Sequence, residues 1–456
     1  MHTCESVSQI RSRGESPARL EAHNVALLSK VRTGPERSAA LRFAIEQRLF
    51  GLGFGRAAAA RGWYRRYEWT QTRVQLGTLG TLRALVKRPA RIAREAWRAA
   101  ATHGPAVRDL HGTSLWMQRL QIFWLGLRRG LDPESYYRFW LFRPERRRRA
   151  HKFIQQHEAG LLYRVLAVRD AMDDFYITED KRLFERWCRE HSIPGVVSVA
   201  EFDNGVLIST APVVTLPGRD LFSKPIDSFG GAGARHWKYS GRGAWVGTDG
   251  RAYDRSTLLE ALAAQSRGGG IVLQVCLEND PKVAHLTSGA LCTARILTIR
   301  PPDGEPELVC AVYRMATGAN STDNFSIAGL AAPIDLRTGR LGAAVRGDPH
   351  LVIAPVTRHP NTGALIEGTC LPWWHDATAL VLQAHGKLRS MACVGWDVAL
   401  TGSGPVLVEA NWAPGARLAQ APSGVPLGET NFMRYLDAHM RRSFARGPQS
   451  AADIRQ

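Results

Sequence analysis

Three oxygen-bearing side chains near the C-terminal end of the chain have the types and the spacing of a metal site. Asp397 lies in the apolar run 395–400, and Glu409 and Asn411 close the apolar run 406–411. Residues two apart on a strand point to the same face, and a paired strand can bring Asp397 beside the other two. Carboxylate and amide oxygens form a hard ligand set that suits Mg²⁺ carrying the phosphates of a nucleotide. The alternative is a set of strand acids that face solvent.

The element that must position these residues is a β-hairpin. The two apolar runs flank Thr-Gly-Ser-Gly-Pro at 401–405, a segment rich in turn formers. Apolar runs separated by such a segment are typical of two paired antiparallel strands. We therefore expect Asp397 within the first strand, with Glu409 and Asn411 at the end of the second.

A second candidate site lies upstream, where a lysine leaves a short apolar strand. Lys224 follows residues 221–223, and Gly230, Gly231 and Gly233 stand in the glycine-rich segment 228–233. Glycines let backbone N–H groups approach phosphate oxygens, and a lysine supplies a point charge. The spacing differs from that of a P-loop. A plain surface turn is the alternative for the glycines alone.

The lysine, the glycine-rich loop and the distant Asp…Glu-x-Asn, in this order, resemble the ATP-grasp superfamily, which includes the D-alanine–D-alanine ligases. Over about residues 130–440 the chain more closely resembles the family called sugar-transfer-associated ATP-grasp. The motifs that carry this resemblance are Ser-Tyr-Tyr-Arg at 135–138, Thr-Ala-Arg-Ile-Leu-Thr at 293–298, Asp-Asn-Phe at 323–325, His-Pro-Asn-Thr-Gly at 359–363, Gly-Trp-Asp at 395–397 and Glu-Ala-Asn at 409–411.

The resemblance implies roles for several residues in holding ATP. Lys181, in Glu-Asp-Lys at 179–181, matches the segment that opens the nucleotide domain of D-alanine ligases, as a phosphate or adenine contact. Lys224 with Gly230, Gly231 and Gly233 matches the phosphate lysine and its mobile loop.

The run 271–277 matches the hinge strand whose backbone receives adenine, which implicates Gln274 and Leu277. Most relatives carry glutamate where this chain has Gln274. Glu278 or Asp280 would hold the ribose hydroxyls, and the sequence does not choose between them.

The chemistry that the resemblance implies is ATP-dependent ligation. A carboxylate attacks the γ-phosphate to give an acyl phosphate, and an amine or a hydroxyl then displaces the phosphate. Mg²⁺, or Mn²⁺ in its place, on Asp397, Glu409 and Asn411 would neutralise the phosphate charge. D-alanine ligases place an arginine two residues before the first metal carboxylate, where this chain has Gly395. Arg295 or Arg314 would have to supply that charge, and for Arg295 a cross-strand salt bridge is the alternative role.

Two further polar residues are candidates for contact with substrate. Asn324 precedes Phe325 and is expected either at the cleft or in a turn. His359 begins a segment whose Asn-Thr-Gly suggests a tight turn. It is a candidate for binding substrate or for deprotonating the incoming nucleophile, with an ordinary loop histidine as the alternative.

Composition favours an α/β or α+β enzyme of two or three units. A chain of 456 residues exceeds one ordinary domain. Its seven cysteines form no C-x-x-C pair, so we expect free thiols and no zinc site. With no apolar span of 18 residues and no hydrophobic signal core, the predicted location is cytoplasmic, with peripheral attachment at the inner face of the membrane left open.

The charge is concentrated at the N-terminal end. The first 150 residues carry 29 Lys and Arg against 11 Asp and Glu, while the whole chain has a net charge of +19. This asymmetry predicts a separate basic module. A basic amphipathic helix is expected over about 82–97, broken or kinked at Pro89, and a buried helix over 114–127 that includes Trp116 and Trp124. Such a module can lie on an anionic membrane surface or simply carry a solvated face; nucleic acid is the poorer explanation, because no recognition motif is present.

These features together predict an α+β, ATP-grasp fold, in which two α+β subdomains with antiparallel sheet clasp ATP, preceded by a helical basic extension. The expected divisions are a disordered tail over 1–40, a basic helical module over 41–130, an ATP-grasp region over 131–445 and a flexible tail over 446–456. Within the ATP-grasp region the nucleotide lobe spans about 180–270 and the lobe with the metal site about 271–445. The predicted function is a ligase in polysaccharide or cell-surface glycan modification that takes ATP, a small-molecule or saccharide carboxylate and an amine or hydroxyl acceptor. A nucleotide-responsive membrane-surface scaffold and a sugar phosphotransferase are the alternatives.

Overall fold

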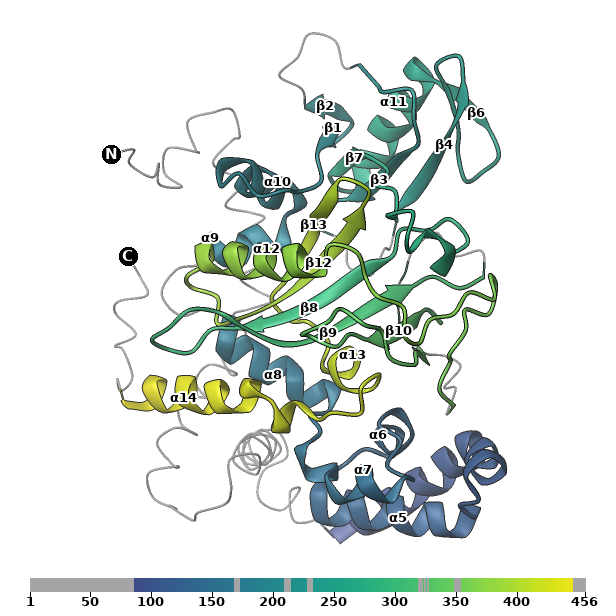
Figure 1. The fold of residues 1–456 in the computed structure, drawn as a ribbon, viewed down its shortest axis with the longest axis vertical. Coiled ribbons are helices and arrows are strands. Elements are labelled where there is room, and N and C mark those ends of the chain that lie inside the picture. Colours follow the sequence, from purple (N-terminus) through teal and green to yellow (C-terminus); the bar gives the residue numbers. More distant parts are fainter. Residues whose placement is uncertain are drawn as a thin grey trace. The chain divides into compact units, whose positions relative to one another are not determined.

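The computed structural model describes residues 86–167, 173–208, 215–227, 233–318, 323, 325, 328–347 and 354–445 (Figure 1). The chain divides into two compact units, one of residues 90–436 and the other of residues 1–89 and 437–456. The predictions for 1–40, for 41–85 and for 446–456 lie outside the described residues.

Helices precede, connect and follow two β-sheets. Residues 86–111 are helical. The α-helices that follow are α5 (Leu115–Arg129), α6 (Pro133–Arg138), α7 (Pro144–Arg148), α8 (Gln156–Ala167), α9 (Asp173–Glu179), α10 (Lys181–Glu190), α11 (Arg255–Gln265), α12 (Trp374–Lys387), α13 (Ala416–Gln420) and α14 (Asn431–Ala445). Short 3₁₀ turns are η1 (Ala150–Lys152), η2 (Ser266–Gly268), η3 (Ala284–Leu286) and η5 (Leu427–Glu429).

The predicted break at Pro89 is wrong for the described part of that helix, which continues through Pro89 to residue 111. The expected apolar stripe is only partly buried: Ile92 and Ala96 are covered, whereas Val86 and Trp97 are exposed.

Helix α5 begins where its sequence predicts. The Ser114 side chain accepts a hydrogen bond from the backbone N–H of Met117, which caps the helix, and Gly130 ends it in the left-handed conformation. Its buried face consists of Gln118, Ile122 and Gly126. The prediction that this helix is buried is therefore wrong for Trp116 and Trp124, which lie on the opposite, exposed face.

The first sheet has seven strands in the order β2-β1-β7-β3-β4-β5-β6, and every pair is antiparallel. One of its faces packs on α11 through a core that includes Phe202, Trp237 and Leu262. The strands are β1 (Ser198–Asp203), β2 (Val206–Ile208), β3 (Leu221–Pro225), β4 (Arg235–Gly241), β5 (Ala244–Val246), β6 (Ala252–Asp254) and β7 (Ile271–Val275). The expected lobe boundary near 271 falls on β7, a central strand of this sheet.

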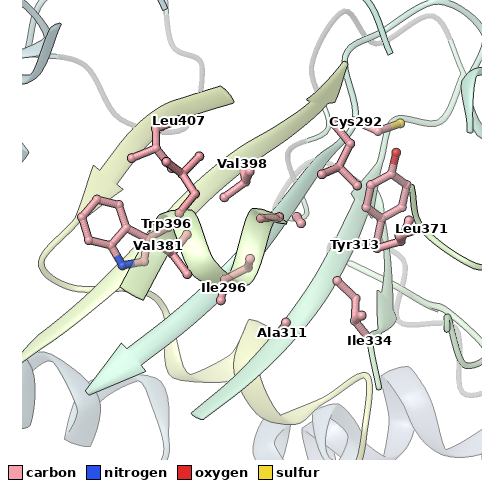
Figure 2. Close-up of a cluster of buried hydrophobic side chains, with 14 of the residues drawn as sticks. Cys292, Ile296, Ala311, Tyr313, Ile334, Leu371, Val381, Trp396, Val398 and Leu407 are labelled. Carbon is pink, nitrogen blue, oxygen red and sulfur yellow. The ribbon is translucent and has the colours of Figure 1, made fainter. Parts of the chain in front are cut away.

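The second sheet has six strands in the order β11-β10-β9-β8-β12-β13, again all antiparallel. Helix α12 covers one face, and the core between them includes Ile296, Val381, Trp396 and Leu407 (Figure 2). The strands are β8 (Thr293–Ile299), β9 (Glu307–Met315), β10 (Leu330–Pro333), β11 (Val345–Arg346), β12 (Cys393–Thr401) and β13 (Gly404–Asn411). The predicted hairpin is β12 and β13, and the predicted α+β architecture with antiparallel sheets is confirmed.

Backbone hydrogen bonds join the segment before the first sheet to the edge of the second. The N–H of Leu407 donates to the carbonyl of Pro194 (2.8 Å), and the N–H of Val196 donates to the carbonyl of Leu407 (3.2 Å). The chain that enters β1 is thereby fixed to the outer edge of β13.

The six cysteines of the described residues are free thiols, as expected. No helix in the described ranges is both long enough and apolar enough to span a membrane.

A buried polar chain secures β12 against α12 and β8. The Trp396 indole N–H donates to the Thr298 hydroxyl (2.9 Å), which lies 2.7 Å from Nδ1 of His385. His385 Nε2 lies 2.9 Å from the carbonyl of Met391, so it carries the proton. Burial lowers the pKa of His385 to about 3, so the folded protein keeps this imidazole neutral where an unfolded chain would protonate it.

We expect the His385→Gln variant to lose pH dependence of stability. The pKa of His385 is about 3 in the folded protein and about 6.5 in an unfolded chain, so between those values only the unfolded state binds the proton, and stability falls as pH falls below about 6.5. From pH 7 to pH 5 the unfolding free energy of the wild type should drop by about 2 kcal/mol more than that of the variant. Urea denaturation at both pH values measures this difference, and equal drops in the two proteins would contradict it.

Candidate active site

A β-bulge in the hairpin aims the predicted ligands to one face of the second sheet. Asp397 pairs with Glu409, but Val398 pairs with Leu407, so Val408 is an extra residue. Leu407 therefore enters the core with Val398, while Glu409 shares the opposite face with Asp397. In a regular strand Leu407 and Glu409 would face the same way.

The structure brings the three predicted metal ligands together on this face. Asp397 lies directly opposite Glu409, and Asn411 pairs with Gly395 one step along the hairpin. The Asn411 amide nitrogen donates to the carbonyl of Gly395 (3.2 Å), which leaves its side-chain oxygen as an acceptor. Glu409 forms no hydrogen bond or ion pair with a described residue.

Asp397 is buried between two arginines from neighbouring strands. Arg295, directly opposite it on β8, donates to both of its carboxylate oxygens, with Nη2 at 2.9 Å from Oδ2. Arg314 on β9 donates to Oδ2 from 3.1 Å. Burial alone would raise the pKa of Asp397, but the two guanidinium groups outweigh it and hold that pKa below its usual range. The carboxylate therefore stays ionised.

Arg314 is itself held by a second acid. Its guanidinium donates to the Thr293 hydroxyl (2.7 Å) and pairs with Asp323 (3.1 Å). The Thr293 hydroxyl in turn donates to Asp323 (2.5 Å). Burial raises the pKa of Asp323 although Arg314 opposes that shift. Thr293 and Asp323 thus position Arg314 against Asp397.

Gly395 makes room for this arrangement. A Cβ atom at this residue would lie 2.3 Å from the Cβ of Pro414 and 3.5 Å from the Cδ of Arg295. An arginine here would have to displace Pro414. Arg295 and Arg314 lie beside Asp397 instead, and Arg295 forms the cross-strand salt bridge that was expected as its alternative role.

The donor set of this face suits a hard divalent cation. Asp397, Glu409 and Asn411 offer oxygen atoms only, which is the chemistry that Mg²⁺ or Mn²⁺ prefers. No group of three or more His, Cys, Asp or Glu residues that could hold a metal ion occurs in the described ranges, so a site here depends on the amide of Asn411. The ligand types fit the ion, although both carboxylate oxygens of Asp397 already accept from Arg295 and one also accepts from Arg314.

The lysines of the first sheet belong to the same charged cluster. Lys224 in β3 pairs with Val272 of β7, on the face opposite Ser223, whose hydroxyl accepts from the buried Trp237 indole (2.9 Å). Burial lowers the pKa of Lys224 to about 8, opposed by attraction to Glu409 and Asp397. The carboxylates of Glu409 and Asp397 on the second sheet thus raise the pKa of Lys224, against the effect of burial.

Lys181 is the first residue of α10, which Asp180 caps, and its ammonium donates to the carbonyl of Ile226 (3.0 Å). Burial lowers its pKa as well, opposed by Glu409 and Asp227. Both predicted phosphate-contacting lysines therefore lie in the field of Glu409.

The glycine-rich loop is described only at its end. Gly230 and Gly231 lie outside the described residues. Gly233 has a φ of +75°, and a Cβ there would lie 2.9 Å from Cγ of Pro225. Glycine at 233 lets the returning chain pass against the residue that follows Lys224.

The predicted adenine-binding strand is β7, a central strand of the first sheet. Gln274 is buried and its amide lies 3.4 Å from the Ser198 hydroxyl. The N–H of Leu277, just beyond β7, donates to no described backbone or side-chain group. Both carboxylate oxygens of Asp280 already accept hydrogen bonds, one from the Trp373 indole (3.0 Å) and one from the N–H of Lys282 (2.8 Å). Glu278 is exposed and is the better candidate for the ribose.

His359 is buried, and the main chain engages both of its ring nitrogens. Nε2 lies 2.9 Å from the carbonyl of Ala316, and Nδ1 accepts from the N–H groups of Asn361 and Thr362 at 3.4 Å. This geometry favours the ordinary loop histidine and leaves no nitrogen for a substrate. Asn324 lies outside the described residues.

Thr293 and Asp323 are site residues that our sequence analysis did not single out. Thr293 is two residues before Arg295, so strand alternation places both on one face. Asp323 directly precedes the candidate Asn324. Strand alternation around Arg295 could have identified Thr293 from the sequence. Asp323 could have been identified as the neighbour of the candidate Asn324.

The model of the family described as sugar-transfer associated ATP-grasp matches residues 169–431. No curated protein matched in sequence. Among solved structures, the chain is similar to D-alanyl-alanine synthetase A from Vibrio cholerae O1 biovar eltor, with 10% identity, a TM-score of 0.36 and coverage of 60% of this chain and 67% of that one.

It is also similar to a D-alanine–D-alanine ligase from Bacillus anthracis complexed with ATP, with 11% identity, a TM-score of 0.33 and coverage of 61% and 70%. An L-amino acid ligase from Bacillus licheniformis shows 13% identity, a TM-score of 0.31 and coverage of 62% and 52%.

The matched family segment spans more than half of the chain and contains both sheets with the site between Lys181 and Asn411. The predicted fold is confirmed, and the chain belongs to the sugar-transfer associated ATP-grasp family.

Proposed function

We propose that this protein is an ATP- and Mg²⁺-dependent ligase that activates a carboxylate as an acyl phosphate and joins it to an amine, or to a hydroxyl, in polysaccharide or cell-surface glycan modification. The observation that carries the proposal is the row of Arg295, Asp397 and Glu409 across three adjacent strands, within the electrostatic reach of Lys224. Family membership supports the use of ATP, and the family's name supports the link to sugar transfer.

The cationic residues of the chain would hold the phosphates, and its oxygen-bearing residues would hold the metal ion. Lys224, with the loop that ends at Gly233, would hold the β- and γ-phosphates, and Lys181 would add a second cation. Asp397, Glu409 and Asn411 would hold Mg²⁺, which when bound supplies charge neutralisation and Lewis acidity. The backbone beyond β7 would receive adenine, with Leu277 contributing an N–H group and Glu278 accepting from the ribose.

Arg295 and Arg314 would act on the reacting groups through their fixed positions. Both guanidiniums are ordered before substrate binds, because Asp397 and Asp323 hold them. Preorganised cations stabilise developing negative charge without reorganisation at the moment of reaction. We assign them to the acyl phosphate and to the tetrahedral species that follows it.

The proposed reaction balances in two steps. A carboxylate oxygen of the substrate forms a bond to the γ-phosphorus, and the bond from that phosphorus to the β-γ bridging oxygen breaks, which releases ADP. The amine nitrogen then attacks the acyl carbon, phosphate departs with the original carboxylate oxygen, and the nitrogen loses a proton. Neither step needs a covalent protein nucleophile, so positioning and charge carry the catalysis.

The Glu409→Gln variant should weaken binding of Mn²⁺ in the presence of ADP by at least about 10-fold, because it removes one carboxylate from the ligand set. Electron paramagnetic resonance of free and bound Mn²⁺ measures this. The melting temperature should fall by less than in Asp397→Asn, because Glu409 attracts Lys224 and Lys181 without pairing directly with a described residue. The exposed Glu367→Gln serves as the matched control.

Asp397→Asn should behave differently, because it leaves the buried Arg295 without a charge partner and Arg314 with Asp323 alone, at a cost of roughly 3–5 kcal/mol of unfolding free energy. If Glu409→Gln binds Mn²⁺ as tightly as the wild type does, the assignment of Glu409 as a metal ligand is wrong.

The reaction class can be tested by isotope transfer. With ATP, Mg²⁺ and a pool of carboxylates labelled with ¹⁸O, a ligase should release phosphate that carries one labelled oxygen, and hydroxylamine should trap the acyl phosphate as a hydroxamate. Mass spectrometry reads both products. A phosphorylated sugar without labelled phosphate would indicate a phosphotransferase, and ATP binding without any ADP release would favour the scaffold alternative.

A further inference from the structure

A cationic groove lies on the helical part of the protein, away from the nucleotide site. Its volume is about 510 Å³, and residues of α5, α7 and η1 line it. Apolar and arginine side chains make up most of that lining: Met117, Leu120, Trp124, Arg128, Arg129 and Arg148. The proposed ligase chemistry uses none of these residues.

The exposed face of α5 is unusually apolar. Trp116, Met117 and Trp124 keep 57%, 46% and 48% of their surface exposed, and they stand on the side opposite the buried Gln118 and Ile122. Isolated exposed hydrophobic residues are common, but a stripe of large ones along one helix marks an interaction site.

Arginines gather at one end of this stripe. Arg128 and Arg129 form the last turn of α5, and Arg148 closes α7. Neither Arg129 nor Arg148 has an ion pair or a side-chain hydrogen bond with a described residue. By contrast Arg147 is bound by Gln121 (3.0 Å) and by two backbone carbonyls, so it joins α7 to α5.

The charge around the groove favours an anionic partner from outside this chain, although Glu429 pairs with Arg149 and Lys152. Residues 115–152 hold ten Lys and Arg against three Asp and Glu, of which Glu145 belongs to α7. The two end segments outside the described residues are also net basic: residues 1–85 have fourteen Lys and Arg against six acids, and residues 446–456 have two against one. Neither end offers a complementary acidic segment.

The pattern favours a lipid surface over nucleic acid. A phosphate backbone needs cations spaced along its track with aromatic rings between them, whereas here Arg128, Arg129 and Arg148 cluster at one end of the stripe, and Arg119 at the other end is stacked on Trp97. Met117 and Leu120 add aliphatic surface, which inserts among acyl chains but offers no ring for base stacking. Tryptophans beside arginines are typical of helices at a membrane interface, where the rings lie at headgroup level and the guanidiniums contact lipid phosphates.

We propose that the exposed face of α5 and the arginine cluster of Arg128, Arg129 and Arg148 form a docking surface for a bilayer rich in anionic phospholipid. The aromatic stripe enters the interface, and the arginines pair with headgroup phosphates. This surface is independent of the proposed ligase activity.

Flotation of the full chain with vesicles tests the proposal. The vesicles are phosphatidylcholine alone or phosphatidylcholine with 30% phosphatidylglycerol, in 0.1 M NaCl. The variant Arg129→Gln/Arg148→Gln should partition roughly 30-fold more weakly onto the anionic vesicles. Arg251→Gln/Arg337→Gln removes the same charge from the surfaces of the two sheets and should match the wild type. Trp124→Ser should lose the binding that persists in 0.5 M NaCl, because that fraction depends on apolar insertion.

Equal losses in the two double variants would overturn the proposal, because binding would then follow net charge alone. The proposal would also be overturned if Arg129→Gln/Arg148→Gln and Trp124→Ser each bound the anionic vesicles as well as the wild type does. Tighter binding to a single-stranded oligonucleotide than to the anionic vesicles, lost in the same variants, would reassign the groove to nucleic acid. Equal melting temperatures of all variants exclude misfolding as the cause.

Discussion

The candidate site depends on how the second sheet compensates for the lost hydration of the buried Asp397 carboxylate. A carboxylate in this interior is tolerated only when partners compensate the lost hydration. Arg295 and Arg314 do so from the two strands nearest on one side, and Asp323 balances the second arginine in turn. The strand register and the positions of β8 and β9 are therefore tied to one buried charge. Any change at Asp397 affects the packing of the sheet as well as its chemistry.

The bulge at Val408 lets strand β13 contribute to both an apolar face and a charged face of this sheet. It turns Leu407 into the core and Glu409 to the charged face although they are two residues apart. The charged face then holds Asp397, Asp323 and Glu409 with Arg295 and Arg314, and Glu409 also attracts Lys224 of β3 and Lys181 of α10. Glu409 is the member of the cluster that has no partner among the described residues, which makes it the natural place for an incoming cation.

Much of this arrangement is predictable from local sequence. The hairpin follows from two apolar runs around a Gly-rich turn, and the start of α5 follows from Ser114. The pairing of Arg314 with Asp397 is not predictable in this way, because 83 residues separate them and nothing local marks the partner. The bulge also escapes prediction: residues 406–408 are all apolar, so no alternation shows where the extra residue enters. The exposure of Trp116 and Trp124 was missed for a related reason, since an aromatic stripe at helical spacing has the same pattern whether it faces a core or an interface.

The most direct test of the account is a crystal structure with Mg²⁺ and a non-hydrolysable ATP analogue. We predict phosphates held between Lys224 and a Mg²⁺ ion on Asp397, Glu409 and Asn411, with adenine at the backbone beyond β7. A nucleotide bound elsewhere, or a metal ion that leaves Glu409 and Asn411 untouched, would contradict it.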